Sequence, residues 1–268
     1  MNRVSKYLRQ NLYANFQAAL PKSASMFIDD ADDDIEAQSG LSIRDDDTQS
    51  LIVASALEAA FEKVDNEVGS ISHWSFTGST ALAVVIHENT MIESRYITVA
   101  NVGDSRAVLS RNGKAIDLTK DHKPNDKFER ERIESLGGSV DWCGQVDDND
   151  NPIESTGCYR INGNLALSRA IGDRSERPWV TNTADISHYL IEEENDDFLV
   201  LATDGLYDVM KSQDVVSFVN DVLGSASHTS RRHVIRRDMA KYVVDEAIKR
   251  GTNDNVTVLI VWLSEKDT

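Results

Sequence analysis

The chain has 268 residues, of which 40% are hydrophobic and 27% charged, values typical of a globular protein with a full hydrophobic core. Its 45 acidic residues outnumber 28 lysines and arginines, and the net charge of -17 disfavours nucleic acids and anionic membranes as partners. No apolar run is long enough to cross a membrane, which excludes a membrane-spanning protein.

The two cysteines, Cys143 and Cys158, lack the Cys-x-x-Cys spacing of a structural zinc site. So few cysteines are typical of proteins from a reducing compartment. We therefore expect a cytoplasmic protein, with the nucleus as the alternative location. We also expect a monomer that binds neither nucleic acid nor membrane.

The N-terminal part of the chain predicts two helices separated by an acidic insertion. Residues 3–20 carry apolar side chains near helical spacing, and Pro21 ends that helix. Residues 29–47 hold two runs of aspartates and are predicted to form a loop. Residues 48–67 again have helical spacing, with Thr48 as the expected N-cap.

The middle of the chain changes to the composition of β-strands. An Asn112-Gly113 pair between two apolar runs predicts a β-hairpin with a two-residue turn, because both positions tolerate positive φ angles. The other expected elements are strands at 81–86, 96–102 and 186–191, a helix at 125–136, a loop at 141–163, and helices at 212–223 and 235–250.

A buried strand at Phe198 to Ala202 is followed by Asp204-Gly205 and, four residues after Asp204, by Asp208. Two carboxylates held beside the end of a buried strand repel each other, and a bound cation relieves that repulsion. The competing interpretation is an ordinary Asp-Gly turn with Asp208 as a helix-terminal acid.

An aspartate at the end of a predicted strand recurs at two other places in the chain, which favours the cation-binding interpretation. Asp254 stands immediately before the strand-like run Val256 to Leu263, and Asp121 follows a strand signal at Ala115 to Thr119. Carboxylate oxygens gathered from separate strand ends are typical ligands of Mg²⁺ or Mn²⁺. The strands, grouped by hairpins between helices, predict an α+β fold with antiparallel sheets.

Seven segments in this order resemble the type 2C family of metal-dependent serine/threonine protein phosphatases. They are Phe76 to Ala81, Ala100 to Ala107, Leu118 to Pro124, Glu131 to Gly138, Leu165 to Asp173, Thr203 to Val209 and Asp254 to Thr257. The resemblance implies a single domain over 1–268, built as a four-layer α-β-β-α sandwich of two antiparallel sheets flanked by helix pairs. It also implies a variable flap at 141–185 beside the active-site cleft.

The resemblance further implies the function and its residues. Asp204 and Asp254 match the aspartates that bind the catalytic pair of Mg²⁺ or Mn²⁺ ions, and Asp121 and Asp208, with Asp204, match the ligands of a third ion. The implied reaction is hydrolysis of phosphoserine and phosphothreonine in phosphorylated protein substrates by a metal-activated water. His122, in a turn that ends at Pro124, is expected to be structural rather than a general acid.

The chain differs from the family pattern at its start. It has no Asp-Gly-His-Gly-Gly motif and lacks the strands that precede it, so we expect an N-terminally incomplete sandwich that hydrolyses phosphate esters poorly on its own. Three interpretations follow: an incomplete copy of an active phosphatase, a pseudophosphatase that binds phosphoproteins or acts as a regulatory module, or a fold completed by strands from another chain.

Overall fold

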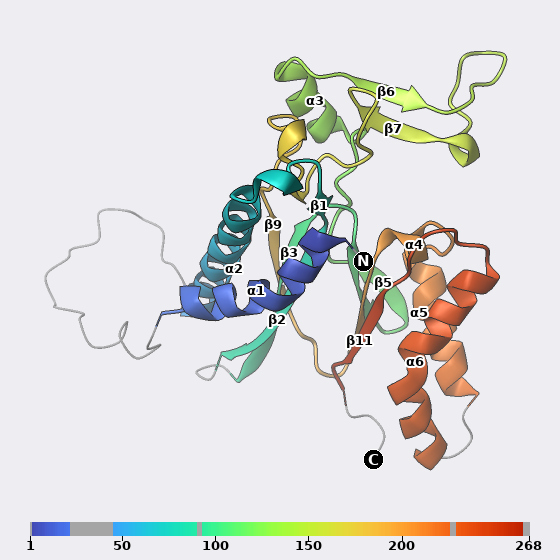
Figure 1. The fold of residues 1–268 in the computed structure, drawn as a ribbon. Helices are drawn as coiled ribbons and strands as arrows, with labels where there is room; N and C mark the ends of the chain where they lie inside the picture. Colours follow the sequence, from blue (N-terminus) through green and yellow to red (C-terminus); the bar gives the residue numbers. More distant parts are fainter. Residues whose placement is uncertain (1, 22–44, 90–92, 226–228, 265–268) are drawn as a thin grey trace, which may run out of the picture.

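The computed structural model describes residues 2–21, 45–89, 93–225 and 229–264. Two antiparallel sheets lie face to face, with α1 and α2 covering one outer face and α5 and α6 the other (Figure 1). This arrangement confirms the predicted α-β-β-α sandwich. Among the described helices, none is both long and apolar enough to cross a membrane.

The first helix pair is α1 (Arg3–Ala19) and α2 (Asp45–Gly69). The Asn2 side chain caps α1 by accepting a hydrogen bond from the backbone N–H of Val4 at 2.7 Å. Helix α2 begins at Asp45, so Thr48 lies inside the helix and the expectation that it is the N-cap was wrong. The acidic segment predicted at 29–47 thus ends in helix, and its residues up to 44 lie outside the described part of the chain.

The sheet under α1 and α2 has the strand order β2-β3-β9. Its strands are β2 (Ala81–Asn89), β3 (Ser94–Val102) and β9 (Asp185–Leu190). Successive side chains of β3 point to opposite faces, so Ala100 and Val102 pack against the helices while Ile97 and Val99 face the second sheet.

The second sheet has the order β11-β10-β4-β5. Its strands are β4 (Arg106–Arg111), β5 (Lys114–Asp117), β10 (Asp196–Ala202) and β11 (Val258–Trp262). The β4–β5 turn has φ of 51° at Asn112 and 72° at Gly113, which confirms the predicted hairpin.

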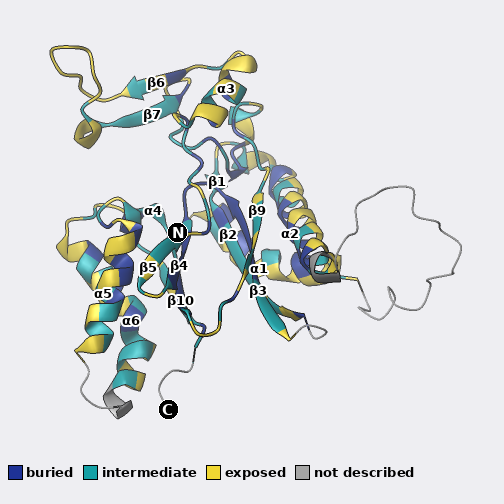
Figure 2. Ribbon diagram, turned by 180° about the vertical axis from the view of Figure 1, so that it is seen from behind, coloured by how far each residue is buried: buried dark blue, intermediate teal, exposed yellow. Residues whose placement is uncertain are grey.

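Helices α5 (Ser212–Gly224) and α6 (Thr229–Lys249) cover the outer face of this second sheet, and the short α4 (Asp204–Tyr207) follows β10 directly. On β10, Phe198 and Val200 face the helices, whereas Leu199 faces the first sheet together with Leu109 of β4. Within the two sheets, buried residues concentrate on β3, β4 and β10 (Figure 2).

A smaller unit projects from the end of the sandwich at which α4 lies (Figure 1). It contains α3 (Lys127–Ser135), β6 (Val140–Cys143) and β7 (Cys158–Ile161), packed around a small core that includes Ile133 and Ile161. The paired strands β6 and β7 correct the expectation that 141–163 is only a loop. The remaining elements are β1 (Gly78–Ser79), β8 (Ile171–Gly172), and the 3-10 helices η2 (Ser72–Trp74), η3 (Glu154–Thr156) and η4 (Arg174–Glu176).

The layer between the sheets predicts a large stability effect at Leu199, which is 0% exposed. We expect Leu199→Ala to lower the free energy of unfolding by about 2 to 5 kcal/mol, because it leaves a cavity between two rigid sheets. Urea unfolding followed by fluorescence measures the change. Leu259 on the neighbouring strand β11 is 55% exposed and provides the control, since Leu259→Ala should cost less than about 1 kcal/mol. Equal losses at both positions would contradict this packing.

Candidate functional site

A cavity of about 1060 Å³ lies at the end of the sandwich that carries the α3–β6–β7 unit. It is lined by the start of α1, the β3–β4 turn, the β10–α4 turn, the loop before β11, and the β6–β7 hairpin. Four carboxylates from three of these segments share it: Asp104, Asp204, Asp208 and Asp254.

Asp204 and Asp208 are placed by the end of β10. The strand stops at Ala202, Thr203 begins the helical turn of α4, and Asp204 is its first residue. The backbone N–H of Asp208 donates to the carbonyl of Asp204 at 2.8 Å, so the two side chains lie one helical turn apart. The strand end therefore presents both carboxylates to the cavity.

Asp254 is held close to them because two loops interlock. The Thr203 hydroxyl donates to the carbonyl of Asn255 at 3.2 Å and accepts from the N–H of Thr257 at 3.0 Å. A Cβ at Gly205 would lie 2.7 Å from that same Asn255 carbonyl, closer than side-chain atoms approach backbone. Only glycine at position 205 thus lets the two loops meet this closely.

Asp104 was not among the residues singled out from the sequence, yet it is 4% exposed and lines the cavity. The turn that carries it has φ of +105° at Gly103, where a Cβ would lie 2.4 Å from Thr80 Cγ2. Asp104 follows a β-rich run and adjoins a glycine, as Asp204 does. That shared pattern was the sequence signal that could have identified it.

Burial and neighbouring carboxylates raise the pKa values of two of the acids, Asp204 and Asp208. Burial raises the pKa of Asp204 to about 6, and repulsion from Asp104, Asp208 and Asp254 adds to the shift. Burial also raises the pKa of Asp208, with repulsion from Asp104 and Asp254 in the same direction. Protonated or cation-bound carboxylates are therefore favoured in this cavity.

Lys123 supplies positive charge within this group. Its ammonium donates to Asp104 Oδ2. Burial lowers the pKa of Lys123, but attraction to Asp104 and Asp204 outweighs that effect and raises it. Lys123 in turn pulls the pKa values of Asp204 and Asp208 downward.

The structure does not bring Asp121 to the cavity lining. Both of its carboxylate oxygens accept from the Arg106 guanidinium, at 3.0 Å from Nε and 2.8 Å from Nη2. Arg106 also donates to Ser212 Oγ at 3.0 Å and lies over the Tyr207 ring, which ties the β4–β5 hairpin to α4 and α5. This bidentate pair engages the Asp121 carboxylate, while repulsion from Asp121 still contributes to the raised pKa of Asp208. The role of Asp121 as an ion ligand stays a prediction.

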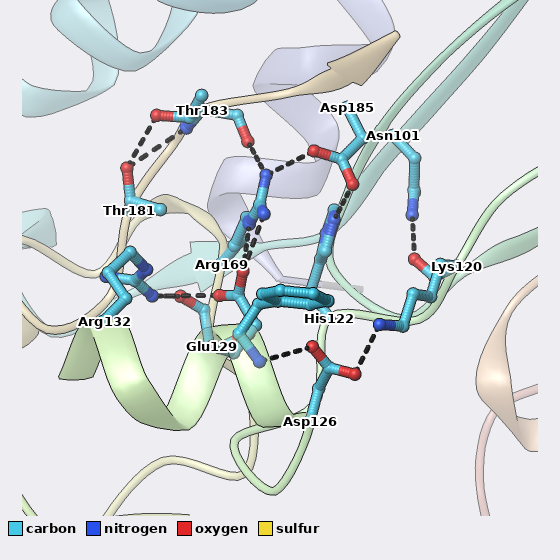
Figure 3. Close-up of polar contacts among 12 residues, drawn as sticks. Asn101, Lys120, His122, Asp126, Glu129, Arg132, Arg169, Thr181, Thr183 and Asp185 are labelled. Carbon is cyan, nitrogen blue, oxygen red and sulfur yellow. Dashed lines mark hydrogen bonds and ion pairs between the residues drawn. The ribbon is translucent and has the colours of Figure 1, made fainter. Parts of the chain in front are cut away.

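His122 is 2% exposed and both ring nitrogens are engaged, as expected for a structural residue. Nδ1 accepts from the backbone N–H of Gly103 at 3.0 Å, so the ring proton resides on Nε2 and is donated to Asp185 Oδ2 at 3.0 Å (Figure 3). His122 thereby fixes the turn that carries Asp104.

The His122 contact continues into a partly buried ion network shown in Figure 3. Arg169 joins Asp185 to Glu129, with 2.7 Å from Nη1 to Asp185 Oδ1 and 2.6 Å from Nη2 to Glu129 Oε1. Burial alone would raise the pKa of Glu129, but hydrogen bonds from Arg169 and Arg132 lower it to about 2. Through His122, the network is connected to the turn that carries Asp104, which lines the cavity.

The donors of the four aspartates are carboxylate oxygens, which suit a hard divalent cation such as Mg²⁺ or Mn²⁺ rather than zinc or copper. Within the described residues, no three His, Cys, Asp or Glu side chains stand close enough together to hold a metal ion. The carboxylate oxygens of Asp104, Asp204, Asp208 and Asp254 are of the chemical type that such an ion prefers, but they are distributed around the cavity, with Lys123 among them, rather than gathered at one point.

Comparison with known proteins identifies the family. Residues 2–256 match the family described as Protein phosphatase 2C. The chain belongs to this family. It is 40% identical over 214 residues to the Arabidopsis thaliana protein named "Probable protein phosphatase 2C 69", covering 79% of this chain and 52% of that protein. It is 31% identical over 267 residues to "Probable protein phosphatase 2C 59" of Oryza sativa subsp. japonica, covering 99% of this chain and 64% of that protein.

The chain thus spans about half to two thirds of these curated phosphatase 2C relatives. Solved structures share its fold. A serine-threonine phosphatase 2C from Toxoplasma gondii superposes with a TM-score of 0.68 at 20% identity, over 97% of this chain and 82% of that one. A C.elegans sex determining protein gives 0.70 at 24% identity, over 97% of this chain and 53% of that one.

The Glu129 network predicts a defined pH dependence of stability. Glu129 has a lowered pKa in the folded protein, so its contribution is fully present above about pH 5 and is lost as the pH falls toward 2. We expect Glu129→Gln to lower the free energy of unfolding by about 2 to 3 kcal/mol at pH 7. That difference should shrink toward zero near pH 2 in urea unfolding series.

The neighbouring Glu131 is exposed on the same helix and serves as the matched control. Glu131→Gln should change the free energy of unfolding by less than about 0.5 kcal/mol at either pH. A loss at Glu129 that stayed constant from pH 7 to pH 2 would contradict the ionic origin of its effect.

Proposed function

We propose that this protein hydrolyses phosphoserine and phosphothreonine in phosphorylated proteins in a reaction that depends on Mg²⁺ or Mn²⁺. The observation that carries the proposal is the gathering of four carboxylates in one cavity of a phosphatase 2C fold, with the pKa of Asp204 raised to about 6. Such charge crowding costs stability unless a cation is bound. We propose Asp204 and Asp254 as ligands of the catalytic ions.

Asp208 and Asp104, with Asp204, are the proposed ligands of a further ion, in addition to the Asp121 expected from the sequence. Asp208 shares a helical turn with Asp204, and Asp104 reaches the cavity from the turn that joins β3 of the first sheet to β4 of the second. When bound, the ions supply the Lewis acidity that activates water and offsets charge on a phosphoryl group.

The other lining residues would bind and orient the phosphorylated segment. Of the described residues that line the cavity, two are positively charged, Lys123 beside the carboxylates and Arg160 on β7. Trp142 and Tyr159 of the β6–β7 hairpin also line the cavity, with ring centroids 5.2 Å apart. We infer that Arg160 offers charge to the phosphate, while the aromatic pair contacts the flanking peptide.

A second candidate function is a phosphoprotein-binding module without turnover. It is favoured by the position of Lys123, whose ammonium contacts Asp104. This contact neutralises part of the negative charge that would otherwise attract a metal ion. A protein that keeps this contact would retain a cavity for phosphopeptides but bind ions weakly.

Metal binding predicts a stability response that depends on Asp204. Saturating Mn²⁺ should raise the melting temperature by roughly 5 °C, because a ligand bound only by the folded state stabilises it by about 2 to 3 kcal/mol at 100-fold excess over its dissociation constant. Asp204→Asn should abolish that increase in differential scanning fluorimetry.

Asp121→Asn provides the matched control for this experiment. It removes an equal charge from a nearby position that pairs with Arg106, so it should lower the melting temperature without Mn²⁺ yet keep most of the Mn²⁺-induced increase. An Asp121 variant that loses the response while the Asp204 variant retains it would reverse our assignment of the two residues.

Hydrolysis itself is tested by phosphate release from a phosphothreonine peptide with Mn²⁺. We expect Asp204→Asn to reduce the rate of phosphate release more than about 100-fold. Losing a hydrogen bond that supports a metal ligand costs about 10- to 100-fold, and losing the ligand itself should cost more. From the sequence we expect this chain to hydrolyse phosphate esters slowly on its own. That expectation stays a prediction, and the same assay measures it. Phosphopeptide binding by calorimetry without any release above background would instead support the binding module.

A further inference from the structure

Two cysteines face each other across the hairpin that borders the cavity. In the antiparallel β6–β7 ladder, Cys143 is the direct partner of Cys158. Both are free thiols. Side chains directly opposite in an antiparallel pair lie on the same face of the ladder, so the two sulfur atoms extend to the same side.

The spacing of such a pair suits a disulfide. Opposed residues of antiparallel strands have Cα atoms about 4.5 to 5.5 Å apart, whether or not they form the hydrogen-bonded type of pair. Disulfides span Cα separations of about 4.4 to 6.8 Å. A bond could therefore form here without movement of the strands.

The adjacent backbone holds the two strands together at this point. A Cβ at Gly157 would lie 2.1 Å from the Cys143 carbonyl oxygen and 2.5 Å from Gly144 Cα. Glycines at 144 and 157 thus allow an unusually close approach next to the cysteines. This proximity fixes the register in which Cys143 and Cys158 are opposed.

Both thiols are accessible to a small oxidant. Cys143 is exposed, with Sγ 3.9 Å from the carbonyl oxygen of Asp141 on its own strand. Cys158 is half-buried and lines the cavity beside Tyr159. The more exposed Cys143 is positioned to react first, and Cys158 to resolve the product.

We propose that Cys143 and Cys158 form an oxidation-sensitive dithiol site that closes to an intramolecular disulfide with hydrogen peroxide. The Cys143 thiolate attacks the peroxide O–O bond and becomes a sulfenic acid with release of one water. The Cys158 thiol then attacks the sulfenic sulfur, forms the S–S bond and releases a second water. Two thiols are oxidised, and one peroxide is reduced to two waters.

The disulfide would join β6 to β7 directly beside Trp142 and Tyr159, which line the cavity. It would restrict the hairpin against which a peptide must pack. This consequence rests on the proposed function, but formation of the disulfide does not. The experiment therefore measures the bond first and phosphate release second.

The test treats the whole chain with a modest excess of hydrogen peroxide, blocks remaining thiols with N-ethylmaleimide and measures the intact mass. We expect both alkylation sites to be lost, with a mass about 2 Da below the reduced protein, and dithiothreitol to restore both sites. Peptide mapping should find Cys143 joined to Cys158. Separate sulfinic acids, or disulfides only between chains on a non-reducing gel, would overturn the proposal.

Cys143→Ser and Cys158→Ser are the matched controls. Each should be oxidised by the same treatment to a sulfenic or sulfinic acid, or to a disulfide between chains, without the loss of two hydrogens within one chain. Equal rates of thiol loss in the double-thiol protein and in both variants would mean that the cysteines act independently, which also overturns the proposal. If the disulfide forms while phosphate release is absent, only the proposed function fails.

Discussion

Electrostatic repulsion among four carboxylates at one end of the sandwich is the constraint on which the site depends. Asp104, Asp204, Asp208 and Asp254 are brought into one cavity by strand ends and turns, and their crowding with burial raises the pKa of Asp204 to about 6. Rigid packing between and outside the sheets must offset this cost. The protein offers one internal counter-ion, Lys123, which contacts Asp104. Charge accumulated at a site and opposed by the rest of the fold is typical of functional centres.

The supporting structure around these carboxylates is itself charged and buried. His122 links the Asp104 turn to Asp185, and Arg169 links Asp185 to Glu129. Hydrogen bonds from its arginine partners lower the pKa of Glu129, opposite in direction to the shift at Asp204. The molecule thus separates two kinds of acid. Those in the network are satisfied by arginine and hold the geometry, whereas those in the cavity are held apart from such partners.

Most of the sandwich could be predicted from the sequence, because its strands are apolar runs and its Asn112-Gly113 turn has a defined backbone chemistry. The site was harder to predict. Asp121 and Asp104 both follow strand signals, and only the folded chain reveals that Arg106 takes the Asp121 carboxylate. An ion pair between side chains on different elements of the fold produces no local sequence pattern from which it could be predicted. The strands β6 and β7 were missed because each has four residues and an acidic, polar segment separates them.

The interlock between Thr203, Gly205 and Asn255 has a consequence for biosynthesis. The ribosome delivers the chain from its N-terminus, and the segment with Asp104 emerges long before those with Asp204 and Asp254. Thr203 finds its partners, Asn255 and Thr257, only when the segment leading into β11 has emerged. A nascent or stalled chain that ends before that point carries three of the acids without the clasp that organises them. The acidic centre can therefore be completed only after the segment leading into β11 has emerged.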